Sequence, residues 1–316
     1  MWALIVLFIC GLILIVKGGD FFVDAAAWMA EVSGIPHFLI GATVVSVATT
    51  LPELFVSCLG AARGSNAIAI GNAVGSVTAN TGLIMAISII FMPIVAKRST
   101  YLFKSVLLIL ATAILYVASF GKRFSLIGSA ALLIIFAVYT YHSIKEAKSG
   151  SDTSERREYE KKEIPLNILK FLFGAVGIVV GADLLVKSAT EIATVSGVPE
   201  AVISATIVAV GTSLPELVTA ITAIVKKQTS LSVGNIIGAN LIDISVILPI
   251  CSFVSKDGLV SLKQNLYIDF PVCLLVLLIA IVPALRREKF SKAQGFVLLT
   301  VYIAYVCVIS FFNPFK

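Results

Sequence analysis

Two glutamates that directly follow a proline are the side chains best placed to do chemistry in this sequence. Glu53 ends the segment PHFLIGATVVSVATTLPE (36–53), and Glu216 ends PEAVISATIVAVGTSLPE (199–216). The two segments start 163 residues apart and are identical at 10 of 18 positions, so the chain contains an internal duplication. An acid inside an apolar run is costly in lipid, and its presence in both copies predicts a functional site.

Each Pro-Glu motif has the chemistry of a site for a hard cation. Pro52 has no N–H and its ring clashes with a carbonyl about one turn earlier, which frees carbonyls near Thr49. Pro215 acts in the same way near Thr212. Two carboxylates and these carbonyls would supply most of the about six to eight oxygens that Ca²⁺ takes. The alternative is a packing kink with a Glu–Lys pair, which the absence of Lys and Arg from these helix cores disfavours.

A second duplicated block predicts a polar stripe on a neighbouring helix. Asn72, Ser76 and Asn80 are spaced by four residues and therefore lie on one helical face. The stripe of the other copy consists of Asn235, Ala239 and Asp243. In both copies the first Asn lies within a Gly-x-x-x-Gly pattern, which allows close approach of another helix. We expect each striped helix to press against a Pro-Glu helix and complete a site.

The elements that position these residues are membrane helices. The chain is 59% apolar and 13% charged, and its apolar runs of about 20 residues are long enough to cross a bilayer. We predict an all-α polytopic membrane protein with ten transmembrane helices. The expected spans are 2–28, 36–62, 67–92, 101–119, 124–144, 164–190, 199–225, 230–254, 265–284 and 293–312. The first span is expected to be a retained helix, because no basic segment precedes it.

The ten helices divide into two units of five. We predict a first repeat over 1–144, a polar linker over 145–163 and a second repeat over 164–316. An odd number of helices in each unit makes the second repeat inverted. Of the 24 Lys and Arg residues, 17 fall on the side of the linker and 7 on the other side. The positive-inside rule therefore places the linker in the cytoplasm and both termini outside.

The duplicated blocks resemble those of the cation/calcium antiporter superfamily, and of prokaryotic sodium/calcium exchangers in particular. The matching blocks are GATVVSVATTLPEL (41–54) with GNAVGSVTAN (71–80), and SATIVAVGTSLPEL (204–217) with GNIIGANLID (234–243). They are similar to the two α-repeats of that family, here 36–80 and 199–243, and the resemblance covers nearly the whole chain. It implies a secondary antiporter of the cell (inner) membrane that exchanges Ca²⁺ for Na⁺ by alternating access. It also implies neither enzymatic activity nor a cofactor.

The resemblance assigns roles to individual residues. The implied calcium ligands are the carboxylates of Glu53 and Glu216 and the carbonyls of Thr49 and Thr212. The implied sodium sites include Ser46, Thr50, Ser76, Ala209 and Ser213, and the central polar pair is Asn80 with Asp243. The chain departs from the family at Ser46, where Ala is usual, and at Ala239, where Ser is usual. It also has Ala48-Thr49-Thr50 where Gly-Thr-Ser is usual. Calcium binding is little affected by these departures, whereas sodium coupling stays open.

Several alternatives remain at this stage. If the protein is an antiporter, the counter-ion could be H⁺ or K⁺ instead of Na⁺. A cation channel is a more distant alternative function. An intramembrane aspartyl protease needs two close Asp residues, but Asp243 has Asn80 as its counterpart. The expected partners are Ca²⁺, Na⁺ and the lipid bilayer. The net charge of +6 requires no nucleic acid, because the Lys and Arg residues are mainly in short loops. No protein partner is evident.

The other side chains that could do chemistry are the five cysteines and three further acids. The five cysteines lie in apolar stretches without a Cys-x-x-Cys pair, and we expect them to be small packing residues. Asp20 and Asp183 are repeated near helix ends, where a structural cap and a role in ion access are equally consistent with the pattern. Asp269 is expected at the membrane interface, near an end of the ninth helix.

Overall fold

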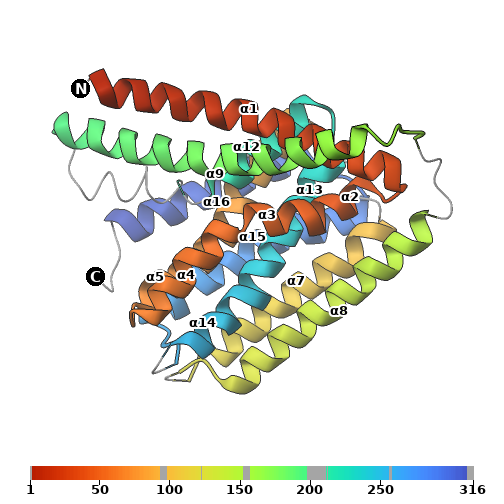
Figure 1. Ribbon diagram of the computed structural model, residues 1–316. Coiled ribbons are helices and arrows are strands. Elements are labelled where there is room, and N and C mark those ends of the chain that lie inside the picture. The colour runs from red at the N-terminus through yellow and green to blue at the C-terminus, as the bar shows by residue number, and fades with distance from the viewer. Residues whose placement is uncertain are drawn as a thin grey trace.

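The computed structural model describes residues 2–92, 98–121, 123–151, 157–197, 211, 213–255 and 258–311. In these residues the regular elements are helices (Figure 1). The first repeat contains α1 (Trp2–Ser33), α2 (His37–Ile40), η1 (Gly41–Val45), α3 (Ser46–Thr49), α4 (Leu51–Ala62), α5 (Asn66–Ala79), η2 (Asn80–Met85), α6 (Ala86–Phe91), α7 (Arg98–Ala118) and α8 (Leu126–Ser151). The second contains α9 (Glu163–Val195), α12 (Leu214–Val225), α13 (Thr229–Ile242), η4 (Asp243–Ile247), α14 (Leu248–Val254), η5 (Asn265–Asp269), α15 (Phe270–Arg287) and α16 (Lys292–Phe311).

The helices have the length and composition of membrane spans. Within the described residues, eight helices are long and apolar enough to cross a membrane, or nine if the bent pair His37–Thr49 and Leu51–Ala62 is one span. These correspond to nine of the ten expected spans. The first part of the remaining span, 199–225, lies largely outside the described residues, and its second part is α12. The structure is thus that of a multi-pass membrane protein.

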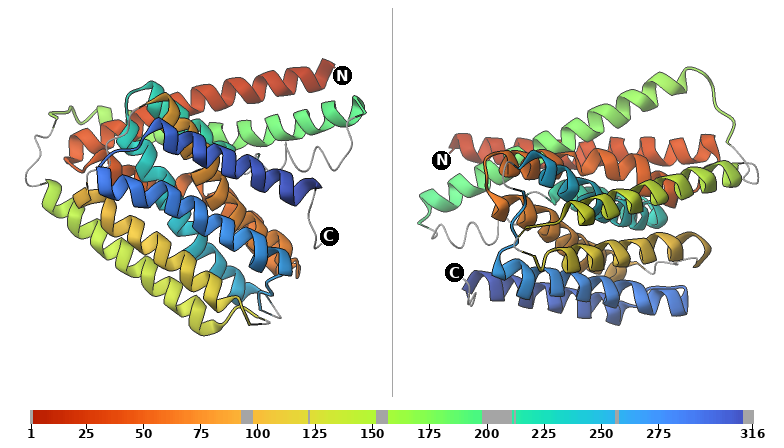
Figure 2. Two further views of the ribbon diagram at one scale, coloured as in Figure 1. Left: turned by 180° about the vertical axis from the view of Figure 1, so that it is seen from behind. Right: turned by 90° about the horizontal axis from the view of Figure 1, so that it is seen from below.

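The first helices of the two repeats form an antiparallel pair. Helices α1 and α9 lie side by side along most of their length and run in opposite directions (Figures 1 and 2). Their backbones meet at repeat-equivalent glycines: a Cβ on Gly18 would lie 2.9 Å from the Gly174 carbonyl oxygen, and one on Gly181 would lie 2.8 Å from that of Gly11. Small residues permit such close packing of membrane helices.

The region between the repeats is more structured than a solvated linker. Helix α8 continues to Ser151, beyond the expected end at residue 144. The end of the linker rests on α1, where the Arg157 N–H donates to the Glu31 carbonyl at 3.1 Å. The Trp28 indole N–H donates to the Glu163 carboxylate at 3.1 Å. These contacts tie the start of α9 to the end of α1.

The two striped helices occupy the centre of the bundle. Within the 18-residue apolar stretch of each span, 72% of the residues are buried in Ile68–Phe91 and 83% in Thr229–Val254, against 22% in α1 and in α9. Each central span changes from α-helix to a π-helical segment, at Asn80 in one repeat and at Asp243 in the other. Such wider turns are frequent at functional sites because they redirect side chains and loosen the regular hydrogen bonding.

The Pro-Glu motifs start new helices. Helix α3 ends at Thr49 and α4 begins at Leu51, with a bend of 45° between the two halves of the span. Pro52 lies in the first turn of α4, where its missing N–H removes no intrahelical hydrogen bond. The predicted kink is therefore a full interruption, and it places Glu53 in the first turn of α4. Glu216 has the same position in α12.

Candidate ion-binding site

Three carboxyl groups are buried in the middle of the bundle. Glu53, Glu216 and Asp243 come from α4, α12 and η4, and their exposed fractions are 0%, 1% and 0%. All six carboxylate oxygens lack a hydrogen-bond partner among the described residues. Helix α4 of the first repeat packs against η4 of the second, so acids of both repeats lie in one part of the bundle. Isolated buried carboxylates are costly, and a bound cation would compensate them.

Further oxygen atoms without partners lie on the helices that carry these acids or on helices packed against them. The hydroxyls of Ser76, Ser213 and Thr219 and the Oδ1 atom of Asn80 are buried and have no hydrogen-bond partner among the described residues. The Thr49 hydroxyl lies 3.3 Å from the Asn235 Oδ1 atom, across the contact between α3 and α13. Oxygen donors of this kind suit Ca²⁺ and Na⁺ rather than softer transition metals.

The carboxylates alone do not make a metal cage. Among the described residues, no group of three His, Cys, Asp or Glu side chains converges closely enough to hold a metal ion. A cation bound between Glu53 and Glu216 would therefore need hydroxyl, amide or carbonyl oxygens to complete its coordination shell. That requirement agrees with the mixed set of oxygen donors expected from the two Pro-Glu motifs.

Three asparagines hold the site helices in place. The Asn72 side-chain amide donates to the Glu53 carbonyl at 3.2 Å and to the Ser57 hydroxyl at 2.9 Å, which fixes α4 on α5. Asn80 donates to the Asn240 Oδ1 atom at 3.1 Å, and Asn240 donates to the Thr81 hydroxyl at 2.9 Å. The amide pair therefore joins the two repeats at the start of η2.

Asn240 is a site residue that the sequence analysis missed. Its repeat equivalent is Val77, so a search for polar residues present in both copies passes over it. A signal was available, because Asn240 is a third polar residue in the block GNIIGANLID, between Asn235 and Asp243. Its side chain is 1% exposed and has a partner on each side, which is the pattern of a positioning residue.

Of the remaining predicted ligands, Ser46 and Thr50 already make hydrogen bonds, and two others are not among the described residues. Ser46 is buried, and its hydroxyl donates to the Thr43 carbonyl at 3.1 Å. The Thr50 hydroxyl donates to the Ser46 carbonyl at 2.6 Å. Both hydroxyl groups act as donors in these bonds, so their oxygen lone pairs can still coordinate a cation. Thr212 and Ala209 lie outside the described residues, so their predicted roles stay predictions.

The close helix approach expected from Gly-x-x-x-Gly is present in the second repeat. A Cβ on Gly234 would lie 2.9 Å from the Phe38 carbonyl carbon and 3.0 Å from the Ala42 nitrogen. A Cβ on Gly238 would lie 2.8 Å from the Ala42 carbonyl carbon. Helix α13 thus packs backbone to backbone against α2 and η1 of the other repeat. For Gly71 and Gly75, the repeat-equivalent partner segment lies outside the described residues.

Asp20, Asp24 and Asp183 lie in the interior of α1 and α9, not near helix ends as expected for Asp20 and Asp183, and they form ion pairs. Asp20 and Asp24 lie 3.3 Å and 2.8 Å from the Lys226 ammonium, and Asp183 lies 2.8 Å from that of Lys187. Burial lowers the pKa of Lys226, but the neighbouring Asp24 and Asp20 outweigh it and raise the pKa overall. These pairs favour the structural reading of the repeated Asp residues.

Asp269 lies near the start of the span Asn265–Arg287, as the sequence predicts, and it is buried inside the protein, while its position at the membrane interface stays a prediction. Its side chain is 3% exposed, and its carboxylate accepts hydrogen bonds from the Asn265 amide at 2.8 Å and the Tyr305 hydroxyl at 3.0 Å. The start of the ninth span, η5, packs against α5. The bond from Tyr305 joins η5 to α16.

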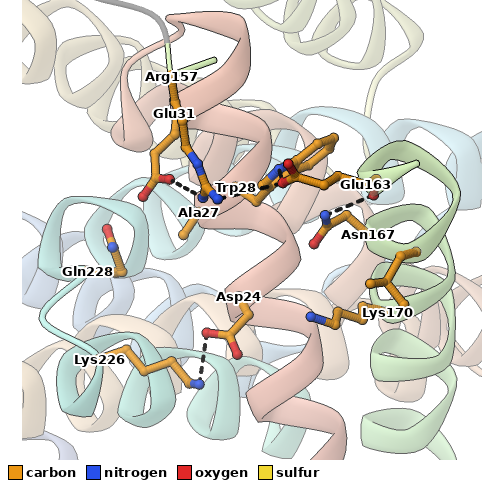
Figure 3. Close-up of a pocket in the computed structure, with 11 residues that line it drawn as sticks. Asp24, Ala27, Trp28, Glu31, Arg157, Glu163, Asn167, Lys170, Lys226 and Gln228 are labelled. Carbon is orange, nitrogen blue, oxygen red and sulfur yellow. Dashed lines mark hydrogen bonds and ion pairs between the residues drawn. The ribbon is translucent and has the colours of Figure 1, made fainter. Parts of the chain in front are cut away.

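A surface cavity of about 380 Å³ lies away from the buried carboxyls (Figure 3). It opens where α1, the start of α9, the end of the linker and the turn after α12 meet. Acids and bases alternate on its wall, and several are joined in pairs: Arg157 lies 3.2 Å from the Glu31 carboxylate, and Lys226 lies 2.8 Å from that of Asp24. The cavity is thus a junction between elements, separate from the candidate ion site.

Known proteins resemble this chain over almost its full length. The profile of the family described as "Sodium/calcium exchanger protein" matches residues 3–145 and 166–311. A membrane protein of Methanocaldococcus jannaschii is 31% identical over 94% of this chain and 94% of its own length. The sodium/calcium exchanger MaX1 of Methanosarcina acetivorans is 26% identical, and the alignment covers 95% of this chain and 96% of the length of MaX1.

The fold also matches a solved structure. The sodium-calcium exchanger NCX_Mj, soaked with Na⁺ and Sr²⁺, superposes with a TM-score of 0.82 at 30% sequence identity, and 98% of each chain is covered. Together with the matches in sequence, this confirms the resemblance inferred from the duplicated blocks.

Proposed function

Because this chain belongs to the sodium/calcium exchanger protein family, we propose that it exchanges Ca²⁺ for Na⁺ across the cell membrane by alternating access. The observation that carries the proposal is the set of three buried carboxyls, Glu53, Glu216 and Asp243, whose oxygens have no hydrogen-bond partner among the described residues. They come from both repeats, on α4, α12 and η4. A transported cation would supply the missing partner for part of the cycle.

The ligand roles follow from charge and donor type. Glu53 and Glu216 hold Ca²⁺, with the Thr49 and Thr212 carbonyls completing its shell, because a divalent ion depends on the number of charged ligands. Neutral oxygens suit Na⁺, which carries less charge. The sodium sites are assigned to Ser46, Thr50, Ser76, Ala209 and Ser213. Asn80 and Asp243 form the polar centre, where η2 and η4 begin.

The repeats are proposed to be inverted, with the units 1–144 and 164–316 on either side of the linker 145–163. The antiparallel packing of α1 and α9, which are repeat equivalents, supports this arrangement. The start of α1 and the end of α16 lie toward the same end of the molecule in all three views. The linker faces the cytoplasm and both termini face outward, in agreement with the positive-inside rule, which counts Lys and Arg rather than net charge.

Opposite orientation of the repeats is testable at two equivalent positions. Ser65 and Gln228 precede α5 and α13, are 163 residues apart, and are both half-buried. Ser65→Cys is expected to react with an impermeant maleimide added outside intact cells, whereas Gln228→Cys is expected to react only after the membrane is opened. The protein without either added cysteine is the control. Labelling of both variants from the same side would contradict inversion.

The driving ion is testable by calcium uptake into proteoliposomes with Na⁺, K⁺ or H⁺ gradients imposed in turn. We expect uptake to follow the Na⁺ gradient. Asp243→Asn gives the second repeat the same amide that the first repeat has at Asn80. We expect this variant to retain much of the sodium-driven exchange. If uptake ignores Na⁺ and follows a pH gradient, the counter-ion is H⁺ and this variant should stop uptake.

Proton coupling is the second candidate function because of one observation. Asp243 is a fully buried acid without a hydrogen-bond partner among the described residues, while its repeat equivalent is the neutral Asn80. Like charges close together in a low dielectric favour protonation of one carboxyl. A proton on Asp243 could therefore be bound and released during the cycle, and the gradient experiment separates this role from sodium coupling.

A further inference from the structure

Two cysteines from different repeats lie in contact, one of them on the helix that carries Glu53. The Cys251 and Cys58 sulfur atoms are 3.9 Å apart, one on α14 and the other on α4. We propose that these thiols are a redox-sensitive pair whose oxidation to a disulfide ties α4 to α14 and stops ion exchange. The effect on exchange rests on the proposed function, whereas the formation of the disulfide does not.

The geometry requires little movement of the two side chains. A disulfide has an S–S distance of about 2.05 Å, so the sulfurs must approach by about 2 Å. Cys58 is half-buried and Cys251 is buried. The neighbours Phe55 and Leu59 on α4 are largely exposed on the apolar surface of the protein, which faces lipid in a membrane. A small oxidant that dissolves in the bilayer can therefore reach Cys58.

The chemistry is a two-electron oxidation. Both S–H bonds break and one S–S bond forms, while two protons and two electrons pass to the oxidant. A membrane-soluble quinone is an acceptor of the required class, because it takes up two electrons and two protons to become the hydroquinone. The reverse reaction with an external dithiol restores both thiols by disulfide exchange.

The position of the pair gives the disulfide a mechanical effect. Cys58 follows Glu53 by five residues on the same helix. A bond to α14 therefore holds a proposed calcium ligand of the first repeat against a helix of the second repeat.

The two repeats differ at this contact. The equivalents of Cys58 and Cys251 are Ile221 on α12 and Ser88 on α6. Helix α4 lies against α14 over a longer contact than α12 makes with α6. In transporters built from inverted repeats, the two halves exchange arrangements between the access states. We therefore expect α4 to separate from α14 during the cycle, and a disulfide would prevent that step.

The test treats the purified full-length protein in proteoliposomes with diamide, a membrane-permeant thiol oxidant that is itself reduced to the hydrazine. Intact mass after denaturing alkylation reports the disulfide, and calcium exchange is measured on the same sample before and after dithiothreitol. The variants are Cys58→Ser and Cys251→Ser. Cys273→Ser removes another buried cysteine, which lies on α15, and serves as the matched control.

We expect oxidised wild-type protein and Cys273→Ser to lose two alkylatable thiols and about tenfold or more of their exchange rate, because alternation is blocked. Dithiothreitol should restore both. The two other variants should keep their exchange rate under diamide. The proposal fails if all five thiols of the treated wild type remain alkylatable, if the disulfide forms without loss of exchange, or if Cys58→Ser is inhibited equally.

The same experiment separates this proposal from the proposed function. If reduced wild-type protein moves no calcium under any gradient, the function is wrong, while the mass measurement still reports the thiol pair. If reduced protein exchanges calcium but forms no disulfide, only the thiol pair is wrong.

Discussion

Replacement of Glu53 or Glu216 by glutamine is expected to lower calcium exchange by about a hundredfold or more, because each change removes one formal charge from a site for a divalent ion. Glutamine keeps the volume of the side chain and one carbonyl oxygen, so the packing of α4 and α12 is preserved. Uptake of radioactive calcium into proteoliposomes measures the effect. Glu288→Gln is the matched control, since Glu288 is exposed at the end of α15.

A loss of exchange through misfolding is distinguishable from a loss of the site. The carboxylates of Glu53 and Glu216 are buried without partners, so glutamine should leave the melting temperature in calcium-free buffer unchanged or raise it. Calcium should raise the melting temperature of the wild type, because a ligand that binds only the folded state stabilises it. That rise should be lost in both variants. Near wild-type exchange in both would show that these acids are not the calcium ligands.

Gly234→Ala is expected to disrupt the centre of the protein although alanine is the better helix former. Alanine improves helix propensity by about 1 kcal/mol over glycine. Here, however, its Cβ would lie 2.9 Å from the Phe38 carbonyl carbon and 3.0 Å from the Ala42 nitrogen. Both are backbone atoms and cannot rotate away. The clash should push α13 away from α2 and η1, at a cost of about 1–3 kcal/mol.

This displacement reaches the ion site directly. Helix α13 carries Asn235 and leads into Asp243, so a shift alters both repeats at their contact. We expect a lower melting temperature in detergent and an exchange rate reduced by about tenfold, as sub-ångström positioning is required of ion ligands. Gly121→Ala, in the exposed turn after α7, should change neither quantity. A Gly234→Ala protein with wild-type stability and exchange would contradict the packing described for α13.

The class of the protein and the identity of its central acids could be predicted without a structure. Apolar runs of about 20 residues are a local signal, and they correspond to nine of the expected spans in the described residues. The duplication at an offset of 163 residues singled out Glu53 and Glu216. An acid within a membrane span raises the free energy of insertion, so its presence in both copies indicates a shared role. Asp243 emerged from the same alignment, opposite Asn80.

Other features depended on how distant helices pack. The contact between Cys58 and Cys251 joins residues 193 positions apart, and no repeat or motif links them. Asn240 has no polar equivalent, and its role follows only from its bonds to Asn80 and Thr81. The hydrogen bond from Tyr305 of α16 to Asp269 likewise joins distant segments and has no counterpart in a sequence motif.

The difference has a physical reason. Hydropathy and duplication act along the chain, so the sequence by itself determined that this is a helical membrane protein with two repeated, acid-bearing broken helices. Tertiary packing alone decided where each helix is interrupted or widened, since the π-helical turns at Asn80 and Asp243 place groups against the opposite repeat. It also decided which buried polar atoms found partners. The carboxylates of Glu53, Glu216 and Asp243 found none in the described residues, and that leaves them available to a cation.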